Sequence, residues 1–433
     1  TGYSQWATVK NIHPALKTIV PQVAVMPGYD FPMENNVPLS HILSWSNDNI
    51  YKNKQLPRSL PFDFFNKGTV YNKLDSLAGI PNPIFQTWLS HPAYDNYWQS
   101  MVPTPTEYAK INIPVLTTTG YYDGSQIGAL QYFKLHNKYN KIGEVQVSTL
   151  LSVKTGGCTE DCSYCPQAAR YNTGVNVHKL MDVEDVLSKA NEAKESGSTR
   201  FCMGAAWREI RDNKDFDKVL DMVRGVNDLG LEVCCTMGML TTEQAHKLKD
   251  AGLYAYNHNI DTSEEYYDKV ITTRTYTDRL NTIENVRKAG ISVCSGGIIG
   301  LGETDEARIG MIYTLANLPE HPGSVPINAL VAVEGTPLEE MKRVSIFEML
   351  RMIATVRIIM PKTLVRLSAG RLDMAVAEQA LCFMAGANSI FAGDKLLTTP
   401  NPSFMNDMEM FKLLGLKPRE AFKDANTTVE LMS

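Results

Sequence analysis

The sequence lacks the features of proteins that bind nucleic acids or membranes. It contains no lysine- or arginine-rich block, and its 42 basic and 47 acidic residues give a net charge of −5. Such a chain presents no electrostatic footprint for nucleic acid or for an anionic membrane. Its most apolar segment, residues 345–360, carries Glu348, Arg351 and Arg357 and is shorter than the roughly 20 residues of a membrane span. We therefore expect no nucleic-acid partner and no membrane association.

Cysteine is absent from the first 157 residues, and all eight cysteines lie between positions 158 and 382. Secreted scaffolds carry disulfides throughout the chain, whereas clustered thiols in a large chain are more often ligands or core residues in a reducing compartment. This distribution predicts a cytoplasmic protein. The opening residues TGYSQWATVK contain neither a basic nor an apolar stretch, so we expect no signal peptide.

A repeating pattern of helix, glycine and strand begins near residue 145. Four predicted helices end at a glycine, the residue that favours a left-handed helix cap: Gly197, Gly230, Gly252 and Gly290. Strands are expected near residues 147–154, 200–206, 232–238, 254–260, 292–299, 325–333, 364–369 and 389–393. Eight such units close a parallel barrel. The alternative, an open doubly wound sheet, should carry a GxGxxG fingerprint in its first turn, where cysteines stand instead. We predict an α/β fold with a (βα)8 TIM-type barrel over residues 144–433.

Residues 1–143 have a different character, with many turn signals such as MPGYDFP and one expected strand within INIPVLTTTGYYDGS that ends at Asp123. This part resembles the α/β-hydrolases of the X-prolyl peptidase and cocaine esterase kind, whose triad follows the order Ser, Asp, His. The resemblance implies a truncated hydrolase-like segment whose nucleophile would lie before Thr1. His136 lies in KLHNKYN, which predicts a lysine-rich helical surface and not a catalytic base. We expect no hydrolase activity.

Three cysteines, Cys158, Cys162 and Cys165, follow the first predicted barrel strand directly. Barrel folds place their active sites at the C-terminal ends of the strands. Three thiolates leave one coordination position of a metal or cluster open, whereas a structural zinc ion normally has four protein ligands. A zinc knuckle completed by a distant His or Cys is the alternative.

The CxxxCxxC spacing, with Tyr164 before the last cysteine, resembles the radical S-adenosylmethionine (SAM) enzymes. The resemblance implies a 4Fe–4S cluster on the three thiolates, with its fourth iron chelated by the amine and carboxylate of SAM. Long runs such as STRFCMGAAWR, YNHNIDTSEEYYDKVITTRTYTDRL and VPINALVAVEGTPL resemble the biotin synthases over about residues 145–415. This implies an enzyme that inserts sulfur into dethiobiotin to form biotin. It also implies a homodimer and a small electron-transfer protein of the flavodoxin or ferredoxin type as partner.

Three further cysteines each lie a few residues past a helix-capping glycine: Cys202, Cys234 and Cys294. Equivalent positions in barrel strands point inward at similar height, although any single buried cysteine is most often a small core residue. The resemblance implies that this trio binds a 2Fe–2S cluster together with Arg366. Arginine is an unusual ligand because its guanidinium is normally protonated and offers no acceptor. Cys235 must face the opposite way along its strand, and Cys382 lies in a helical stretch, so we expect both to pack.

The resemblance also assigns polar side chains to the two small molecules. Asn259 and Asp261 match positions at the ribose of SAM, and Arg279 matches one at its carboxylate, where a bidentate fork is chemically apt. From the residues alone, Arg279 on a solvated helix face is the alternative. Three residues match positions around dethiobiotin: Asn259, Asn328 and Thr398. Buried amides are costly unless they are paired, which favours contact with a ligand.

One departure from the family lies ahead of the first barrel strand. Family members have a helical segment there that closes the barrel floor, whereas this chain has hydrolase-like sequence joined at KYNKIGEVQVS. A non-catalytic iron–sulfur or zinc-binding chain, with the barrel as a scaffold only, is therefore the alternative to the enzyme.

Overall fold

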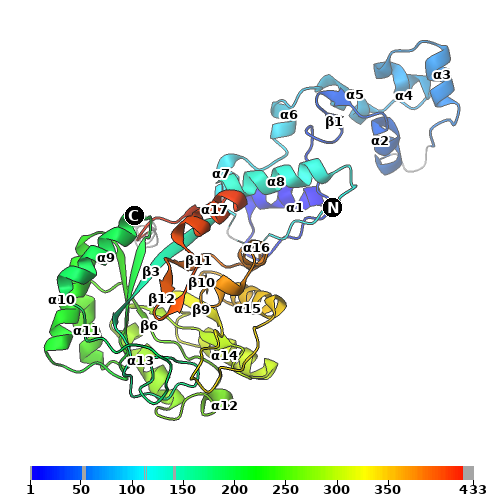
Figure 1. The fold of residues 1–433 in the computed structure, drawn as a ribbon. Helices are drawn as coiled ribbons and strands as arrows, with labels where there is room; N and C mark the ends of the chain where they lie inside the picture. The colour runs from blue at the N-terminus through cyan, green and yellow to red at the C-terminus, as the bar shows by residue number, and fades with distance from the viewer. Residues whose placement is uncertain (1, 51–54, 112, 114, 140–142, 423–433) are drawn as a thin grey trace. The chain divides into compact units, whose positions relative to one another are not determined.

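A computed structural model describes residues 2–50, 55–111, 113, 115–139 and 143–422. Contacts within the chain divide it into two units, Thr1–Ile142 and Gly143–Ser433 (Figure 1). Among the helices of the described residues, none is long and apolar enough to cross a membrane.

The first unit consists of short helices and turns around two small apolar clusters. Its elements are α1 (Gly2–Thr8), η1 (Val9–Asn11), β1 (Met33–Glu34), β2 (Val37–Pro38), α2 (Ile42–Ile50), α3 (Leu60–Asn66), η2 (Tyr71–Lys73), α4 (Leu74–Leu77), α5 (Pro83–Ser90), α6 (Asn96–Gln99), α7 (Pro105–Ala109) and α8 (Gln126–Tyr139). In one cluster the rings of Trp6 and Tyr132 stack with centroids 4.9 Å apart, and Phe85 lies in the other.

The strand predicted within residues 111–123 is wrong in extent. In the described part of this segment, only isolated parallel bridges join residues 115–118 to residues 19–22. A longer ladder is disfavoured because Pro21 has no backbone donor and Val23 has a left-handed φ of 49°. Two residues of the predicted strand lie outside the described residues.

Lys134 and Lys138 are exposed on α8, as predicted, but the placement of His136 on this lysine-rich surface is wrong. The His136 side chain is 5% exposed, and its ring centroid lies 5.6 Å from that of Trp6. It shares the inner face of α8 with Tyr132 and Ala129, which precede it by one and two helical turns. Burial lowers the pKa of His136 to about 4, so the imidazole is neutral at pH 7.

The second unit is a closed parallel barrel, which confirms the predicted fold class. Its strands are β3 (Glu144–Lys154), β4 (Arg200–Ala205), β5 (Glu232–Thr236), β6 (Ala255–Asn257), β7 (Ser292–Cys294), β8 (Gly297–Ile299), β9 (Ser324–Ala329), β10 (Leu364–Leu367) and β11 (Ser389–Ala392). β7 and β8 are successive pieces of one barrel strand, because both pair with β9. Pairing of β10 with β9 and β11, and of β11 with β3, closes the ring.

The strand registers fix the stagger of the barrel. The pairings, followed once round the ring from Ser152, return to β3 at Glu144, eight residues earlier. This is the shear of a TIM barrel, in which each step to the next strand advances the level by one residue. Side chains at one level therefore come from every second strand.

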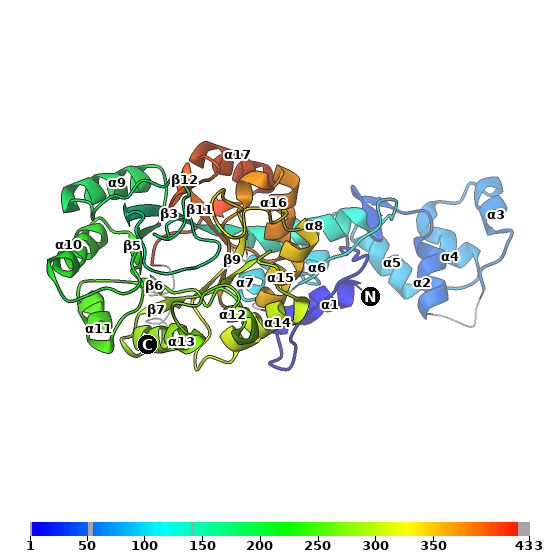
Figure 2. The same ribbon diagram turned by 60° about the horizontal axis from the view of Figure 1, so that its bottom comes forward.

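Helices cover the outside of the barrel (Figures 1 and 2). They are α9 (Val183–Glu195), α10 (Lys214–Asp228), α11 (Thr242–Asp250), α12 (Glu264–Tyr267), α13 (Tyr276–Lys288), α14 (Asp305–Ala316), α15 (Ile346–Ile359), η3 (Arg371–Asp373), α16 (Val376–Ala385) and α17 (Phe404–Leu414). The four predicted capping glycines all have positive φ: Gly197, Gly230, Gly252 and Gly290. On α9, Val186, Ala190 and Ala193 form the buried stripe that the sequence predicts.

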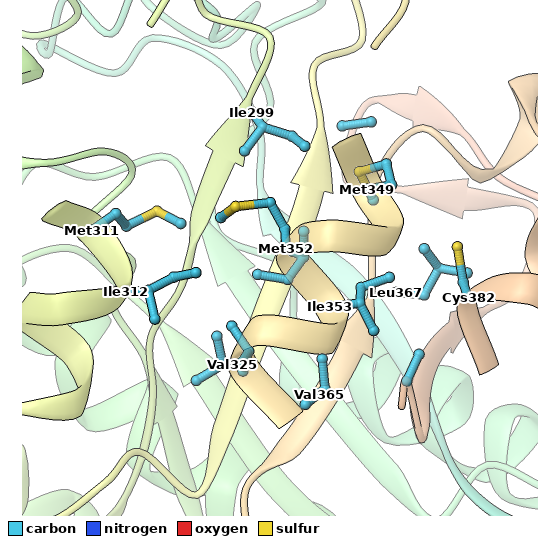
Figure 3. Packing of buried hydrophobic residues seen from close by; sticks show 14 of the residues in the cluster. Ile299, Met311, Ile312, Val325, Met349, Met352, Ile353, Val365, Leu367 and Cys382 are labelled. Atoms are coloured by element: carbon cyan, nitrogen blue, oxygen red, sulfur yellow. The ribbon is translucent and has the colours of Figure 1, made fainter. Parts of the chain in front are cut away.

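Two apolar layers lie between the sheet and these helices. Figure 3 shows one of them, where Met311 of α14 and Met352 of α15 face Val325 and Val365 of the sheet. Cys382 of α16 belongs to this layer, and Cys235 of β5 belongs to the other. Both cysteines are therefore packing residues, as expected.

Short strands complete the second unit. β12 (Lys395–Leu396) and β13 (Thr399–Pro400) form a two-stranded antiparallel hairpin. Near the C-terminus, β14 (Lys417–Pro418) pairs in parallel with the start of β3.

Candidate active site

A cavity of about 320 Å³ lies inside the barrel, toward the C-terminal ends of its strands. Among the predicted site residues, all but Cys294 line it: Cys158, Cys162, Cys165, Cys202, Cys234, Asn259, Asp261, Arg279, Asn328, Arg366 and Thr398. The cysteine loop after β3 forms one side of the cavity, and the β12–β13 hairpin contributes another.

The cysteine loop begins where β3 ends. Gly156 and Gly157 both have left-handed backbone conformations, with φ of 68° and 67°, and turn the chain sharply into the loop. The backbone of Cys158 then makes two hydrogen bonds. Its N–H donates to the carbonyl of Gln167 at 3.0 Å, and its carbonyl accepts from the N–H of Ala169 at 2.7 Å. The loop is thereby folded back on itself, so that its three thiols share the cavity.

The three loop thiols are suited to a cluster. All are free, Cys162 is 6% exposed, and Cys165 is partly buried. Burial raises the pKa of Cys162 to about 12 and that of Cys165 to about 11, so a metal must displace their protons. No three His, Cys, Asp or Glu side chains in the described part of the chain converge as a single metal ion requires. Cysteines that each bind a different iron of a cluster need no such convergence.

A second set of thiols lies inside the barrel. The registers put Cys234, Cys294 and Arg366 in one interior layer together with Ser148, one residue from every second strand. Cys202 is the register partner of Cys234 on the neighbouring strand, so it lies one level nearer the mouth of the barrel. The sequence predicts all three cysteines at similar height. In the structure, the stagger of the strands places Cys202 one level away from Cys234 and Cys294.

The side chain of Arg366 is fully buried among these thiols. Its Nη1 lies 3.9 Å from the sulfur of Cys294, and its guanidinium carbon lies 4.4 Å from the ring centroid of Phe391. Its Nε donates to Ser389 at 2.9 Å, and Nη2 donates to the Oε1 of Gln146 at 3.0 Å. These polar partners hold the guanidinium in place, with one nitrogen toward the cysteines.

Charge favours a thiolate on one member of the Cys202–Cys234 pair. For Cys202, burial opposes ionisation, but a hydrogen bond with Cys234 and the charges of Arg366 and Arg200 outweigh it and lower the pKa. For Cys234, the same hydrogen bond and burial raise the pKa well above its usual range. The buried arginines therefore compensate negative charge at this site.

The SAM-assigned residues lie together beside the cysteine loop. Asp261 has a left-handed φ of 68° and accepts hydrogen bonds from the Tyr164 hydroxyl at 2.9 Å and from Arg279. Arg279 also donates through Nε to the hydroxyl of Tyr267 at 2.9 Å. Arg279 is only 4% exposed, so the alternative of a solvated helix face is wrong. Its burial depends on Asp261, a partner 18 residues away that helix periodicity does not reveal.

The residues assigned to dethiobiotin are distributed around the cavity. Asn259 accepts from the N–H of Gly296 at 3.2 Å. Asn328 donates to the carbonyl of Gly297 at 2.9 Å and accepts from the N–H of Ala369 at 3.2 Å, so both ends of its amide are oriented by backbone. Thr398 lies between β12 and β13.

Two cavity residues escaped the sequence reasoning. Arg274 lies in the turn before α13 with its Nε 3.8 Å from the Glu160 carboxylate, and its Nε and Nη1 have no hydrogen-bond partner in the described structure. His258 is buried, but its unpartnered Nε2 belongs to a side chain that lines the cavity. Burial lowers the pKa of His258 well below its usual value. Neither residue carries a periodic signal, since both lie in loops.

Comparisons with protein families match three ranges of the chain. Residues 152–313 match the Radical SAM superfamily, and residues 326–417 match the Biotin and Thiamin Synthesis associated domain. Residues 1–148 match the X-Pro dipeptidyl-peptidase (S15) family.

Comparisons with individual proteins extend over the barrel. A biotin synthase of Cytophaga hutchinsonii is 73% identical over 292 residues, which cover 67% of this chain and 87% of the relative. The mitochondrial biotin synthase of Arabidopsis thaliana is 61% identical over 287 residues, covering 66% and 76%. Among solved structures, methylornithine synthase (PylB) aligns with a TM-score of 0.56 at 20% identity over 68% of this chain and 90% of that one. HydG, a maturase of the [FeFe]-hydrogenase, also gives 0.56, at 17% identity over 88% and 79%. These structural likenesses concern the fold alone.

Proposed function

The chain belongs to the biotin synthase family of radical SAM enzymes, which convert dethiobiotin to biotin by inserting sulfur, and we propose that it does so with the residues assembled at the barrel cavity. The observation that carries this proposal is the shared cavity: three loop thiols, two interior thiols and the polar residues beside them face one space. A non-catalytic binding chain has no need for substrate-sized room next to both sets of thiols.

The bound 4Fe–4S cluster, SAM and the 2Fe–2S cluster supply the 5′-deoxyadenosyl radical and the inserted sulfur. Cys158, Cys162 and Cys165 would hold the first cluster through three irons and leave the fourth open to SAM. In their fold-back loop, these thiols face the cavity beside Asp261 and Arg279, the side chains assigned to SAM.

Polar side chains would orient both small molecules. Asn259 and Asp261 would bind the ribose of SAM, and Arg279 its carboxylate. Because Arg279 is already shared with Asp261 and Tyr267, it would act as part of a preformed network and not as a free cation. Asn259, Asn328 and Thr398 would contact dethiobiotin, with Asn328 fixed by its two backbone bonds.

The interior layer would hold the 2Fe–2S cluster. Cys202, Cys234 and Cys294 would supply thiolates, and Arg366 the fourth contact, from positions one level apart at most. The buried Arg366 and Arg200 would offset the negative charge of thiolates and sulfides in this buried site. Apolar walls from Leu150 and Phe391 would keep solvent away from the radical.

The finer biological setting is also part of this proposal. Reduction would come from a small electron-transfer protein of the flavodoxin or ferredoxin type, and the working form would be a homodimer. The eight free thiols of the chain agree with a reducing cytoplasm. Residues 144–433 would form the catalytic barrel, and residues 1–143 a hydrolase-like segment without an activity of its own.

Anaerobic reconstitution of the full chain with iron and sulfide tests the proposal. With SAM, dethiobiotin and a reductant, we expect 5′-deoxyadenosine and biotin. Cys382→Ala is the matched control, because this buried cysteine lies in the helix layer away from the cavity, and it should retain both products. A chain that takes up both clusters and forms neither product would be the non-catalytic alternative, and uptake of one zinc ion alone would contradict both cluster assignments.

A further inference from the structure

An acidic residue ties the cysteine loop to a distant turn. The Asp161 carboxylate accepts hydrogen bonds from the backbone N–H groups of Thr272 and Thr273 at 2.9 and 3.2 Å and from both of their hydroxyls. The backbone N–H of Asp161 donates in return to the hydroxyl of Thr273 at 3.2 Å. Five hydrogen bonds thus join residues more than 110 positions apart in the sequence.

Neighbouring groups enclose this contact. Arg170 donates to the carboxylate of Asp161 at 3.0 Å, and the Tyr171 hydroxyl donates to its carbonyl at 2.6 Å. The Thr273 hydroxyl has a single proton, which the carboxylates of Asp161 and the adjoining Glu160 share. The Asp161 side chain is only 6% exposed, so these bonds are shielded from water and cannot be replaced by solvent at little cost.

The turn leads directly to the residues assigned to SAM. Thr272 and Thr273 precede Arg274 and α13, and Arg279 of α13 binds Asp261. The ring of contacts closes at Tyr164, between two of the loop cysteines, whose hydroxyl donates to Asp261. The cysteine loop is therefore held to one segment, residues 258–279, at Asp161, at Tyr164, and at Ser163, whose backbone N–H donates to the carbonyl of Val270 at 3.0 Å.

We infer that Asp161 is a positioning residue for radical SAM chemistry, fixing the loop that carries Cys158, Cys162 and Cys165 at the distance from Asp261 and Arg279 that SAM bridges. This inference rests on the proposed function, since it takes SAM as the molecule between loop and segment. Among the described residues, no hydrogen bond or ion pair joins Asp161 to a thiol, so it acts through the loop that carries the thiols. Its effect is to hold the cysteine loop and residues 258–279 in their binding arrangement before SAM arrives. Less conformational entropy is then lost when SAM binds.

The test separates SAM binding from cluster assembly. In the anaerobically reconstituted chain, Asp161→Asn replaces one carboxylate oxygen, an acceptor for the donors of Thr272 and Thr273, by an amide nitrogen. We expect iron and sulfide contents close to those of the unmodified protein. The SAM dissociation constant per assembled 4Fe–4S cluster should rise by about tenfold, the lower end of the loss seen when groups supporting a metal ligand are removed. The SAM-induced change in the electron paramagnetic resonance spectrum of the reduced cluster should weaken in parallel.

A pair of gentler variants keeps the test open if Asp161→Asn does not fold. Thr272→Val removes one hydroxyl donor at nearly constant shape, and Thr272→Ser retains it. Valine should weaken SAM binding, and serine should restore it. Asp212→Asn is the matched control. The Asp212 carboxylate likewise accepts several hydrogen bonds, here from the side chains of Gln244 and Lys247 on α11, but it is exposed and does not line the cavity.

Two outcomes would overturn the inference. One is an unchanged SAM dissociation constant per cluster in Asp161→Asn or Thr272→Val. The other is equal weakening in the valine and serine variants. Failure of the proposed function has a different signature: the unmodified protein would then form no 5′-deoxyadenosine from SAM, whatever the variants do.

Discussion

Both units of this chain resemble known enzymes, but they differ in the extent of their β-sheets. In the barrel, each strand has a neighbour on both sides, and the closed sheet carries layers of thiols and polar groups at defined levels. In the first unit, the expected strand has only isolated bridges. Tyr121 and Tyr122 beside Asp123 are 81% and 97% exposed. Similarity to an enzyme family therefore predicts a catalytic site only where the sheet that positions the reactive groups is also present.

Loss of one loop thiol should have the largest effect and should be confined to the barrel. On the proposed assignment, Cys162→Ser would leave the 4Fe–4S cluster without one of its three thiolates, so SAM cleavage should fall to background. Assay of 5′-deoxyadenosine together with iron content measures this loss, and tryptophan fluorescence, with four of the five tryptophans before residue 100, checks that the first unit is unchanged. Retained SAM cleavage in this variant would contradict the cluster assignment.

The barrel floor provides the next largest effect. Arg200 and Glu232 form an ion pair at 2.7 Å with side chains 3% exposed, and Glu232 also accepts from Gln146 and from the backbone N–H of Phe422. Glu232→Gln leaves the charge of Arg200 buried and uncompensated, which costs about 3–5 kcal/mol. Denaturant unfolding followed by far-ultraviolet circular dichroism should show this loss in the barrel transition. Glu192→Gln, on an exposed pair of α9, should change the free energy of unfolding by less than about 1 kcal/mol.

The first unit should respond to acid through His136. Its pKa is lowered from 6.5 to about 4 by burial, so the folded state favours the neutral ring. The stability that follows is fully present above pH 6.5 and is lost as the pH falls toward 4, by an amount of about 3 kcal/mol. Tryptophan fluorescence during unfolding at pH 7 and pH 4.5 measures the loss, and His136→Phe should remove most of it.

Asp30 contributes a pH dependence of stability opposite to that of His136, so the two contributions must be distinguished. Burial raises its pKa to about 6, despite hydrogen bonds from the N–H groups of Met26 and Gly128. Its stabilising contribution is therefore present below pH 4 and is lost as the pH rises through 6. Comparison of His136→Phe with the unmodified chain cancels the Asp30 contribution. An identical pH dependence in both proteins would contradict the assignment to His136.

The smallest expected effect concerns Asp123, whose substitution should change no hydrolase activity. Asp123 matches the acid of a hydrolase triad by its place in the sequence, but in the structure its carboxylate accepts from the N–H of Ser125 at 2.7 Å, at the start of α8. Incubation with p-nitrophenyl acetate should give no burst and no turnover, and Asp123→Asn should behave like the unmodified chain. A burst that Asp123→Asn abolishes would restore a catalytic reading of the first unit.

Much of the barrel could be predicted because its helix ends and strand faces are determined by residues that are near one another in the sequence. A glycine after each helix fixes where the helix ends, and alternation along a strand fixes that Cys234 and Cys235 face opposite sides. The cysteine spacing likewise identified the loop. Two errors, the solvated alternative for Arg279 and the surface placement of His136, share one cause: the partner that buries each side chain, Asp261 or Trp6, is distant in the sequence.

By itself, the sequence determined the order of strands and helices, the position of the cysteine loop after the first barrel strand, and the family of the barrel. Only the tertiary structure decided that Cys234, Cys294 and Arg366 share one level with Cys202 a single step away, because that depends on the stagger of strands round a closed sheet. It also decided that Asp161 meets Thr272 and Thr273. Local patterns report what each residue does along the chain, whereas contacts between distant segments exist only once the ring has closed.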